Sequence, residues 1–153
     1  MAHPQPFRLD GRTAFISAAR GHLGAAMTRA LAEAGAHVIV NGRDNAKLAR
    51  FEEQLRSEGF SVERAAFDIA DTNAVRAFFR ERTRLDILVN NAVSMQVKSF
   101  SALEPSDFAA TYESAVTAAF ESARAALPAL KHAAAIAGEA SIVNIASMYG
   151  QVS

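Results

Sequence analysis

The order of apolar and amphipathic segments is the feature of this sequence that most limits its fold. Five short runs rich in apolar residues alternate with longer stretches whose apolar residues recur at helical spacing. The runs cover residues 13–16, 37–40, 61–66, 86–89 and 141–146. Several are continuously apolar, which is typical of parallel strands that helices cover on both faces. The alternation therefore predicts an α/β fold, with strand–helix units repeated around a doubly wound parallel sheet.

The stretches between these runs carry signals of helix starts and ends. The first covers residues 23–34 and is followed by Gly35, a residue that suits the left-handed position after a helix end. The second covers residues 45–57, and a third follows Asp71, whose side chain can cap a helix. Because no linker-like stretch interrupts the pattern, residues 1–153 are expected to form one domain.

The longest expected helix covers about residues 106–127. Its large apolar side chains recur at four-residue steps, at Phe108, Tyr112, Val116 and Phe120. Alanines fill most of its other positions, which permits close packing on two sides. One side is expected to meet the sheet. The helix from Phe108 to Leu127 is also a candidate for contact with a second subunit in a homo-oligomer, and burial within its own domain is the alternative.

Composition excludes several classes of function. The 16 basic and 16 acidic residues are interspersed, so binding to nucleic acid is not expected. The sequence has no cysteine, which excludes disulfides and thiolate metal sites, and its four histidines lack metal-ligand spacing. No stretch approaches the roughly 20 apolar residues that span a bilayer, and residues 1–10 do not resemble a secretion signal. We therefore expect a cytoplasmic protein with no metal and no membrane contact.

Chemistry is expected where the strands end, because ligands of doubly wound sheets bind beyond the carboxyl ends of the strands. Residues 17–24 join the first strand to the first helix, where a nucleotide pyrophosphate would meet the helix amino terminus. Only Gly21 and Gly24 supply the glycine that a phosphate turn needs. The segment alone therefore also fits a tight connection in which Gly24 permits close packing of the helix on the sheet.

Short motifs at the other strand ends extend this observation. They are Asp10-Gly11-Arg12 before the first strand, Asn41-Gly42-Arg43 after the second, Asp68-Ile69-Ala70-Asp71 after the third, Asn90-Asn91-Ala92 at the fourth and Asn144-Ile145-Ala146-Ser147 at the fifth. Their order and spacing resemble the amino-terminal part of the short-chain dehydrogenase/reductase family, over nearly the whole chain. Residues 147–153 are weakly similar to its sugar-acid and polyol dehydrogenases. The resemblance implies a Rossmann-like, NAD(P)-binding domain of five strands that lacks the family's carboxyl-terminal strands.

The resemblance assigns cofactor binding to residues near four strand ends. They are Ser17, Ala18, Arg20, Gly21, His22, Leu23, Gly24, Arg43, Asp68, Ile69, Asn90, Asn91 and Ala92. Asp68 would accept a hydrogen bond from the adenine amino group, and the alternative is a loop carboxylate that helps to cap the next helix. Asn90 and Asn91 would tie adjacent strand ends together, while Ala92 would leave room for the adenosine ribose.

Arg43 bears on the choice of cofactor. It follows the second strand, where the family places the group that reads the adenosine ribose. An arginine there can pair with a 2′-phosphate, so NADP is preferred to NAD. The alternative is a surface arginine whose local partner is Asp44.

Other positions depart from the family's pattern around the cofactor. Ala18 and His22 stand where the first two glycines of the turn are usual, and Ser17 replaces the usual threonine. Val93 stands where glycine is common, which alters the wall of the pocket. Ala18 would strain the turn, while His22 would either crowd the pyrophosphate or donate to it from the helix amino terminus. Both outcomes for His22 stay open.

Ser147 is the catalytic residue that the resemblance identifies. Its hydroxyl would orient the oxygen of a small-molecule alcohol or carbonyl substrate during hydride transfer. The family's Tyr-x-x-x-Lys pair, which handles the proton, is absent from the 153 residues, and Ala115 replaces the asparagine that holds a relay water. We therefore expect an NAD(P)-dependent oxidoreductase by descent that is inactive as this truncated chain. The alternative is a non-catalytic nucleotide-binding or interaction module that pairs with a full-length relative.

Overall fold

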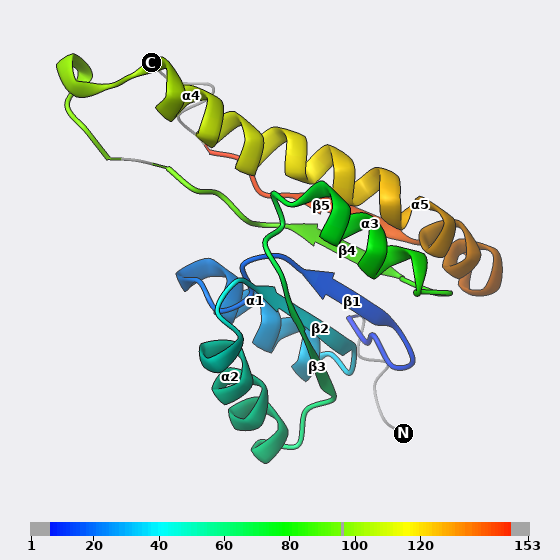
Figure 1. Cartoon of the computed structure of the whole chain (residues 1–153). Coiled ribbons are helices and arrows are strands. Elements are labelled where there is room, and N and C mark those ends of the chain that lie inside the picture. The colour runs from blue at the N-terminus through cyan, green and yellow to red at the C-terminus, as the bar shows by residue number, and fades with distance from the viewer. Residues whose placement is uncertain (1–6, 96, 148–153) are drawn as a thin grey trace.

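Five parallel strands form the sheet of the computed structural model, which describes residues 7–95 and 97–147. They are β1 (Thr13–Ile16), β2 (His37–Gly42), β3 (Val62–Ala66), β4 (Ile87–Asn90) and β5 (Ser141–Asn144). Their order in the sheet is β3-β2-β1-β4-β5, so the chain winds outward from β1 in both directions (Figure 1). The predicted doubly wound parallel sheet is confirmed, with small shifts in the strand limits.

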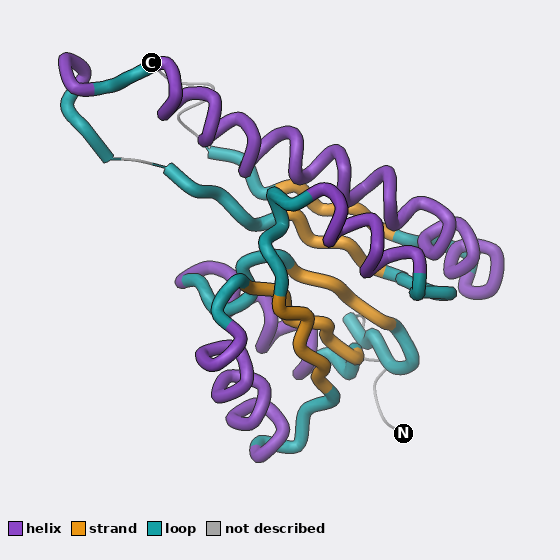
Figure 2. The backbone as a smooth tube through the Cα atoms, viewed as in Figure 1, coloured by secondary structure: helices purple, strands orange, loops and turns teal. Residues whose placement is uncertain are grey.

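Helices cover the two faces of the sheet (Figure 2). Helices α1 (His22–Glu33) and α2 (Asn45–Ser57) lie on one face, where Leu48 and Leu55 join a buried cluster with Ile16. Because successive residues of a strand point to opposite faces, the neighbouring residue Phe15 packs on the other face of the sheet. The apolar runs of the sequence therefore supply two cores at once.

The second core lies beneath α3 (Thr72–Arg80) and α5 (Ala118–Ala137). Phe15 is fully buried there and contacts Phe79 of α3, with ring centroids 5.0 Å apart in an edge-to-face arrangement. Leu130 of α5 belongs to the same cluster. These contacts fix α5 against the side of the sheet that carries β4 and β5.

Capping residues begin and end the helices as predicted. The Asp71 carboxylate accepts hydrogen bonds from the backbone N–H groups of Asn73 and Ala74, at 2.9 and 3.1 Å, and so caps α3. Gly35 follows α1 with a φ of +101°, in the left-handed region that favours glycine. The sequence therefore predicted the start of α3 and the end of α1 correctly.

The expected helix at 106–127 is longer than predicted and is interrupted. It consists of α4 (Pro105–Tyr112), a π-helical turn labelled η2 (Glu113–Thr117) and α5. The prediction ended the helix at about Leu127. That limit was wrong: α5 continues through Pro128, since Ala126 and Leu130 are buried on either side of it. A short 3-10 turn, η1 (Phe100–Ala102), precedes α4.

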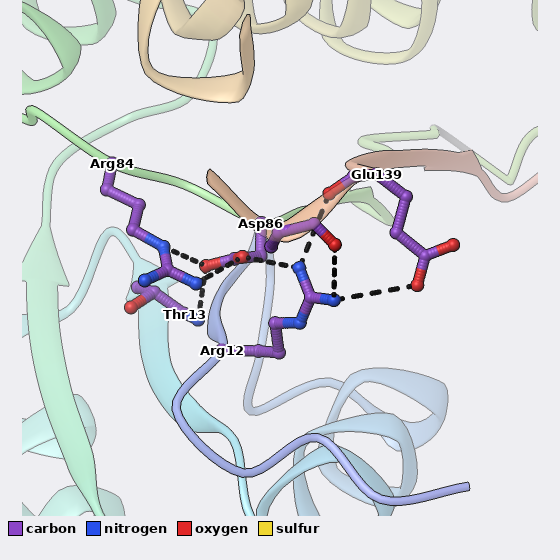
Figure 3. A network of polar contacts seen from close by, with 6 residues as sticks. Arg12, Thr13, Arg84, Asp86 and Glu139 are labelled. Atoms are coloured by element: carbon purple, nitrogen blue, oxygen red, sulfur yellow. Dashed lines mark hydrogen bonds and ion pairs between the residues drawn. The ribbon is translucent and has the colours of Figure 1, made fainter. Parts of the chain in front are cut away.

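A charged network closes the amino edge of the sheet (Figure 3). Asp86, directly before β4, is 2% exposed and accepts hydrogen bonds from Arg84 at 2.8 Å and from Arg12 and the Thr13 N–H at 3.0 Å each. Burial alone would raise the pKa of Asp86, but these hydrogen bonds, led by that from Arg84, outweigh burial and lower the pKa. Arg12 also donates to the Ala137 carbonyl, so the network joins β1, β4 and the end of α5.

Candidate functional site

A pocket of about 460 Å³ lies at the carboxyl edge of the sheet, opposite the Asp86 network. Segments that follow β1, β2, β3 and β4 line it, together with the π-helical turn. Seven of the predicted cofactor residues belong to this lining: Ala18, Arg20, Gly21, Arg43, Asp68, Ile69 and Ala92. The structure thus brings together residues from four strand ends, as the doubly wound topology requires.

The other predicted residues lie behind or beside the lining. Ser17 is buried, and its hydroxyl accepts hydrogen bonds from the N–H groups of Asn91 and Ala92 at 2.9 and 3.0 Å. It lies 3.4 Å from the Val89 carbonyl, to which it donates. Ser17 therefore ties the end of β1 to the end of β4.

The two asparagines at the end of β4 hold strand ends together, as predicted. The Asn90 amide donates to Oδ1 of Asn144 at 2.9 Å, which joins β4 to β5. The Asn91 amide donates to the carbonyl oxygens of Ser17 and Ala18 at 3.1 and 3.3 Å, which joins β4 to the turn after β1. Neither asparagine lines the pocket.

The turn after β1 is tight and strained. Ala18 has a φ of +50°, a left-handed conformation that residues with a Cβ rarely adopt. Its carbonyl accepts the Gly21 N–H at 2.9 Å. A Cβ on Gly24 would lie 2.2 Å from the same oxygen, so only glycine allows the helix to approach the turn this closely. The strain expected at Ala18 and the packing role expected of Gly24 are both present.

The amino end of α1 faces outward beside the pocket. His22 and Leu23, its first two residues, are exposed and do not line the pocket. Within the described residues, no side chain caps this end of the helix, whose N-cap is Gly21. Peptide N–H groups at an uncapped helix start can meet an anion. The two outcomes predicted for His22 stay predictions.

Arg43 and Asp68, from two neighbouring strand ends, face each other across the pocket wall. Arg43 Nη1 lies 3.8 Å from Asp68 Oδ2, and the Arg43 side chain is 70% exposed. Among the described residues, Asp68 and not Asp44 is the carboxylate next to Arg43, while the surface position that the alternative gave Arg43 is present. Asp44 caps α2 by accepting the Lys47 N–H at 3.0 Å. This hydrogen bond and a second from the Lys47 side chain lower the pKa of Asp44. Asp71 caps α3, and the Asp68 side chain accepts the Ala70 N–H at 3.0 Å directly before that cap, so both roles predicted for Asp68 stay predictions.

Sequence reasoning missed several lining residues. Asn41, at the end of β2, is buried and donates to the carbonyl oxygens of Ala65 and Phe67, which ties β2 to the end of β3. Lys47 adds a third basic group to the lining. The only sequence signal that could have identified it is its position in the first turn of α2, four residues after Arg43. Ser94, from the loop after β4, and Ser114, from the π-helical turn, also line the pocket, as do Gly42, Asp44 and Leu48. Val93, which the sequence placed in the pocket wall, belongs to the lining as predicted.

The predicted catalytic residue lies at the same edge of the sheet but outside the pocket. Ser147 follows β5 and is exposed. Ala115, the replacement for the relay asparagine, lies within the π-helical turn. Tyr149 lies outside the described residues. Of the catalytic groups named from the sequence, the structure therefore places only Ser147.

Two general findings concern the described part of the chain as a whole. In residues 7–95 and 97–147, no helix combines the length and apolar character needed to cross a membrane. Over the same ranges, no group of three or more His, Asp or Glu side chains is placed to hold a metal ion.

Comparison with known proteins gives matches along most of the chain. Residues 12–153 match the sequence profile of the short chain dehydrogenase family. The gluconate 5-dehydrogenase of Gluconobacter oxydans (strain 621H) is 35% identical over 96 residues, which are 60% of this chain and 38% of the relative. The D-beta-hydroxybutyrate dehydrogenase of Cupriavidus necator is 30% identical over 148 residues, which are 94% of this chain and 56% of the relative.

A solved structure agrees with the sequence matches. A gluconate 5-dehydrogenase from Burkholderia cenocepacia J2315, in complex with NADP and tartrate, superposes with a TM-score of 0.82 at 35% identity. The superposition covers 96% of this chain and 58% of that chain. These matches cover between 38% and 58% of the length of the relatives.

Proposed function

Since this chain belongs to the short-chain dehydrogenase/reductase family, we propose that it binds a nicotinamide dinucleotide in the pocket at the carboxyl edge of the sheet, with NADP preferred to NAD. The observation that carries the proposal is that the start of a helix with no side-chain cap and three basic side chains meet at one pocket. Those side chains belong to Arg20, Arg43 and Lys47.

The residues present fit the adenosine part of such a cofactor. A volume of about 460 Å³ falls within the range of about 300–1,000 Å³ typical of small-molecule sites. The absence of a Cβ at Gly24 brings the start of α1 close to the strand end, where N–H groups can receive a pyrophosphate. Asp68 and Ile69, which follow β3, also line the pocket. The Asp68 carboxylate suits the polar edge of an adenine ring, and the Ile69 side chain suits its face.

The basic groups favour a cofactor with a 2′-phosphate. Arg43 is largely exposed, and its contact with Asp68 at 3.8 Å is long, so little energy opposes its turning toward a phosphate. The lining carries three basic and two acidic side chains, and the acidic pair consists of Asp44 and Asp68. NADP in the Burkholderia gluconate 5-dehydrogenase supports the same preference.

The proposed reaction is the interconversion of an alcohol and a carbonyl, for which a bound nicotinamide supplies the hydride chemistry. Ser147 would hold the substrate oxygen by a hydrogen bond. Neither Tyr112 nor Tyr149 is followed by lysine four positions later. The 153 residues by themselves therefore bind cofactor without turnover, and the gluconate dehydrogenase relatives favour a sugar-acid substrate for a complete site.

Fluorescence titration with NADPH and NADH tests this proposal. The unaltered chain is expected to give saturable binding with a lower Kd for NADPH. Arg43→Ala should raise the Kd for NADPH about tenfold or more and leave that for NADH nearly unchanged, because a hydrogen bond to a charged group contributes about 1.5–3 kcal/mol. Arg50→Ala, an exposed arginine of α2 outside the pocket, is the matched control. Absence of saturation would refute cofactor binding, and equal Kd values for both dinucleotides would refute the preference.

A second candidate function, an interaction module, is favoured by the outer face of the long helical segment. Its large apolar side chains are exposed, with Phe108 at 73% and Phe120 at 61%. Tyr112 and Val116 lie exposed between them. An apolar ridge of this kind suits contact with a full-length relative or with a second copy of the chain.

A further inference from the structure

A short segment of the pocket wall is held in place from two sides. Residues 92–94 contribute three consecutive lining residues, in the loop that leaves β4. On the strand side, the Ser17 hydroxyl accepts the Ala92 N–H. On the helix side, the segment meets Ser114, the buried residue of the π-helical turn.

The contact with Ser114 engages both backbone groups of Ser94. The Ser94 N–H donates to the Ser114 hydroxyl oxygen at 3.0 Å, and the Ser94 carbonyl lies 3.3 Å from the same oxygen. The hydroxyl proton also has the Thr111 carbonyl within reach, at 3.1 Å. The Ser114 hydroxyl thus accepts a hydrogen bond from the Ser94 N–H and can donate one to the carbonyl of either Ser94 or Thr111.

The surroundings offer the loop few other anchors. Met95, Val97 and Phe100 are exposed, and α4 buries none of its residues. Farther along, Lys98 pairs with Asp107 at 2.7 Å, outside the pocket. Within the described part of the loop, Ser94 is therefore the position where the pocket wall is fastened to the helix.

The π-helical turn explains why a serine here can reach the loop. An extra residue in a turn of helix displaces side chains from the positions that regular α-helical spacing would give them, and such turns are frequent at functional sites. Ser114 points into the fold, whereas its neighbours Tyr112 and Val116 are exposed. Its hydroxyl therefore faces the loop after β4.

We propose that Ser114 is a positioning residue for the cofactor pocket: through Ser94 it fixes residues 92–94 at the separation that a bound adenosine phosphate requires. The proposal rests on the function proposed above. Ser114 acts on affinity by holding the wall before the ligand arrives, so that ordering the loop does not oppose binding.

Calorimetric titration with adenosine 2′,5′-bisphosphate, which carries the adenosine and phosphate groups alone, tests this role. Ser114→Ala should raise the Kd about three- to tenfold, the change expected for one hydrogen bond of about 0.5–1.5 kcal/mol. Ser114→Thr, which keeps the hydroxyl, should restore most of the affinity. Hydrogen exchange at the Ser94 amide should accelerate in the alanine variant and not in the threonine variant.

Ser122→Ala is the matched control on the same helical segment. The Ser122 hydroxyl is fully buried and, within the described residues, has no hydrogen-bond partner, so its loss should leave the Kd unchanged. Circular dichroism establishes that each variant is folded. If Ser114→Ala does not fold, Ser114→Cys, which keeps the volume but hydrogen-bonds weakly, takes its place.

The outcomes separate this inference from the proposed function. If the unaltered chain does not bind the bisphosphate, the proposed function fails. If the unaltered chain binds and Ser114→Ala binds equally well, cofactor binding stands and the role of Ser114 is overturned. An equal loss of affinity in Ser114→Thr would also overturn it, because a steric effect would then replace the hydrogen bond.

Discussion

Ala18 holds a backbone conformation that glycine normally supplies. Its φ of +50° brings the Cβ close to the following carbonyl, which costs roughly 1–2 kcal/mol in a residue other than glycine. The turn keeps this conformation because the Ala18 carbonyl accepts hydrogen bonds from the Gly21 N–H and the Asn91 amide. The strain therefore lies at the edge of the pocket and is maintained by contacts with β4 and α1.

Ala18→Gly is expected to stabilise the protein. Glycine relieves the left-handed strain, and its greater freedom in the unfolded chain offsets part of the gain, so the free energy of unfolding should rise by about 0.5–1 kcal/mol. Urea unfolding measures the change. Ala26→Gly, at an exposed position inside α1, is the control and should lower the free energy by about 1 kcal/mol. A loss at Ala18 as large as that at Ala26 would show that the turn is not strained.

Among single residues, the sequence identified those whose role depends on their immediate neighbours in the chain. Ala18 and Gly24 were recognisable because a turn between a strand and a helix has known backbone demands. Lys47 and Ser114 carry no such signal, because helix geometry brings them to the pocket from outside the strand-end motifs. The contact between Arg43 and Asp68 was not foreseen for the same reason, because Asp68 is distant in sequence but adjacent across two parallel strands.

Among the elements, the long helical segment differs most from its prediction. The spacing of its apolar residues indicated a helix correctly, but no feature of the sequence marked the π-helical turn. The predicted end at about Leu127 was too early, because α5 continues through Pro128 to Ala137. The large apolar side chains of the outer face are exposed, while small residues such as Ala126 and Ala129 face the core.

This exposed face predicts self-association. Removing the apolar area of Phe108 and Phe120 from water would stabilise a dimer, at about 25 cal/mol per Å² of buried apolar surface. Sedimentation velocity over a range of concentrations should show association of the unaltered chain, and Phe108→Gln with Phe120→Gln should abolish it. Ile136→Gln, an exposed apolar position of α5 beyond Leu127, should leave association intact. A chain that is monomeric at every concentration would contradict this prediction.

Across the whole molecule, the Asp86 network holds together segments far apart in the sequence. Arg12 precedes β1, Asp86 precedes β4, and the Ala137 carbonyl ends α5. The charged side chain of Asp86 is buried but accepts four hydrogen bonds from three residues, which is the condition under which a buried carboxylate is tolerated. Removing one partner of this network should therefore destabilise the fold as a whole.

The lowered pKa of Asp86 gives this network a defined dependence on pH. A group whose pKa is lower in the folded state contributes stability above its unfolded pKa, about 3.9, and loses that contribution as the pH falls through the folded value. Asp86→Asn should lower the free energy of unfolding by about 3 kcal/mol at pH 7, and its difference from the unaltered chain should shrink toward pH 2. Urea unfolding across this range measures both effects.

The control for this experiment is Glu53→Gln, because Glu53 is exposed on α2. That variant should follow the unaltered chain at every pH. A difference for Asp86→Asn that stays constant down to pH 2 would show that its charge is not the source of the stability.

The sheet topology was predictable because the apolar runs of β1, β2 and β4 are buried on both faces and are therefore continuously apolar in the sequence. Ala14, Phe15 and Ile16 have no exposed surface at all. The Asp86 network was not predictable, because Arg12 and Asp86 come into contact only when β1 and β4 lie side by side. The family's motifs located the site, but which side chains line it was settled by packing.

The strand order also has a consequence for how the domain assembles. β1 pairs with β2 through neighbouring segments of chain, whereas its other edge pairs Ala14 with Ile87 of β4. During synthesis, β1, β2 and β3 can therefore form one layer with α1 and α2 before β4 has left the ribosome. Until β4 arrives, one edge of the central strand is unpaired and open to incorrect pairing, and we expect this long-range pairing to form later than that of β1 with β2.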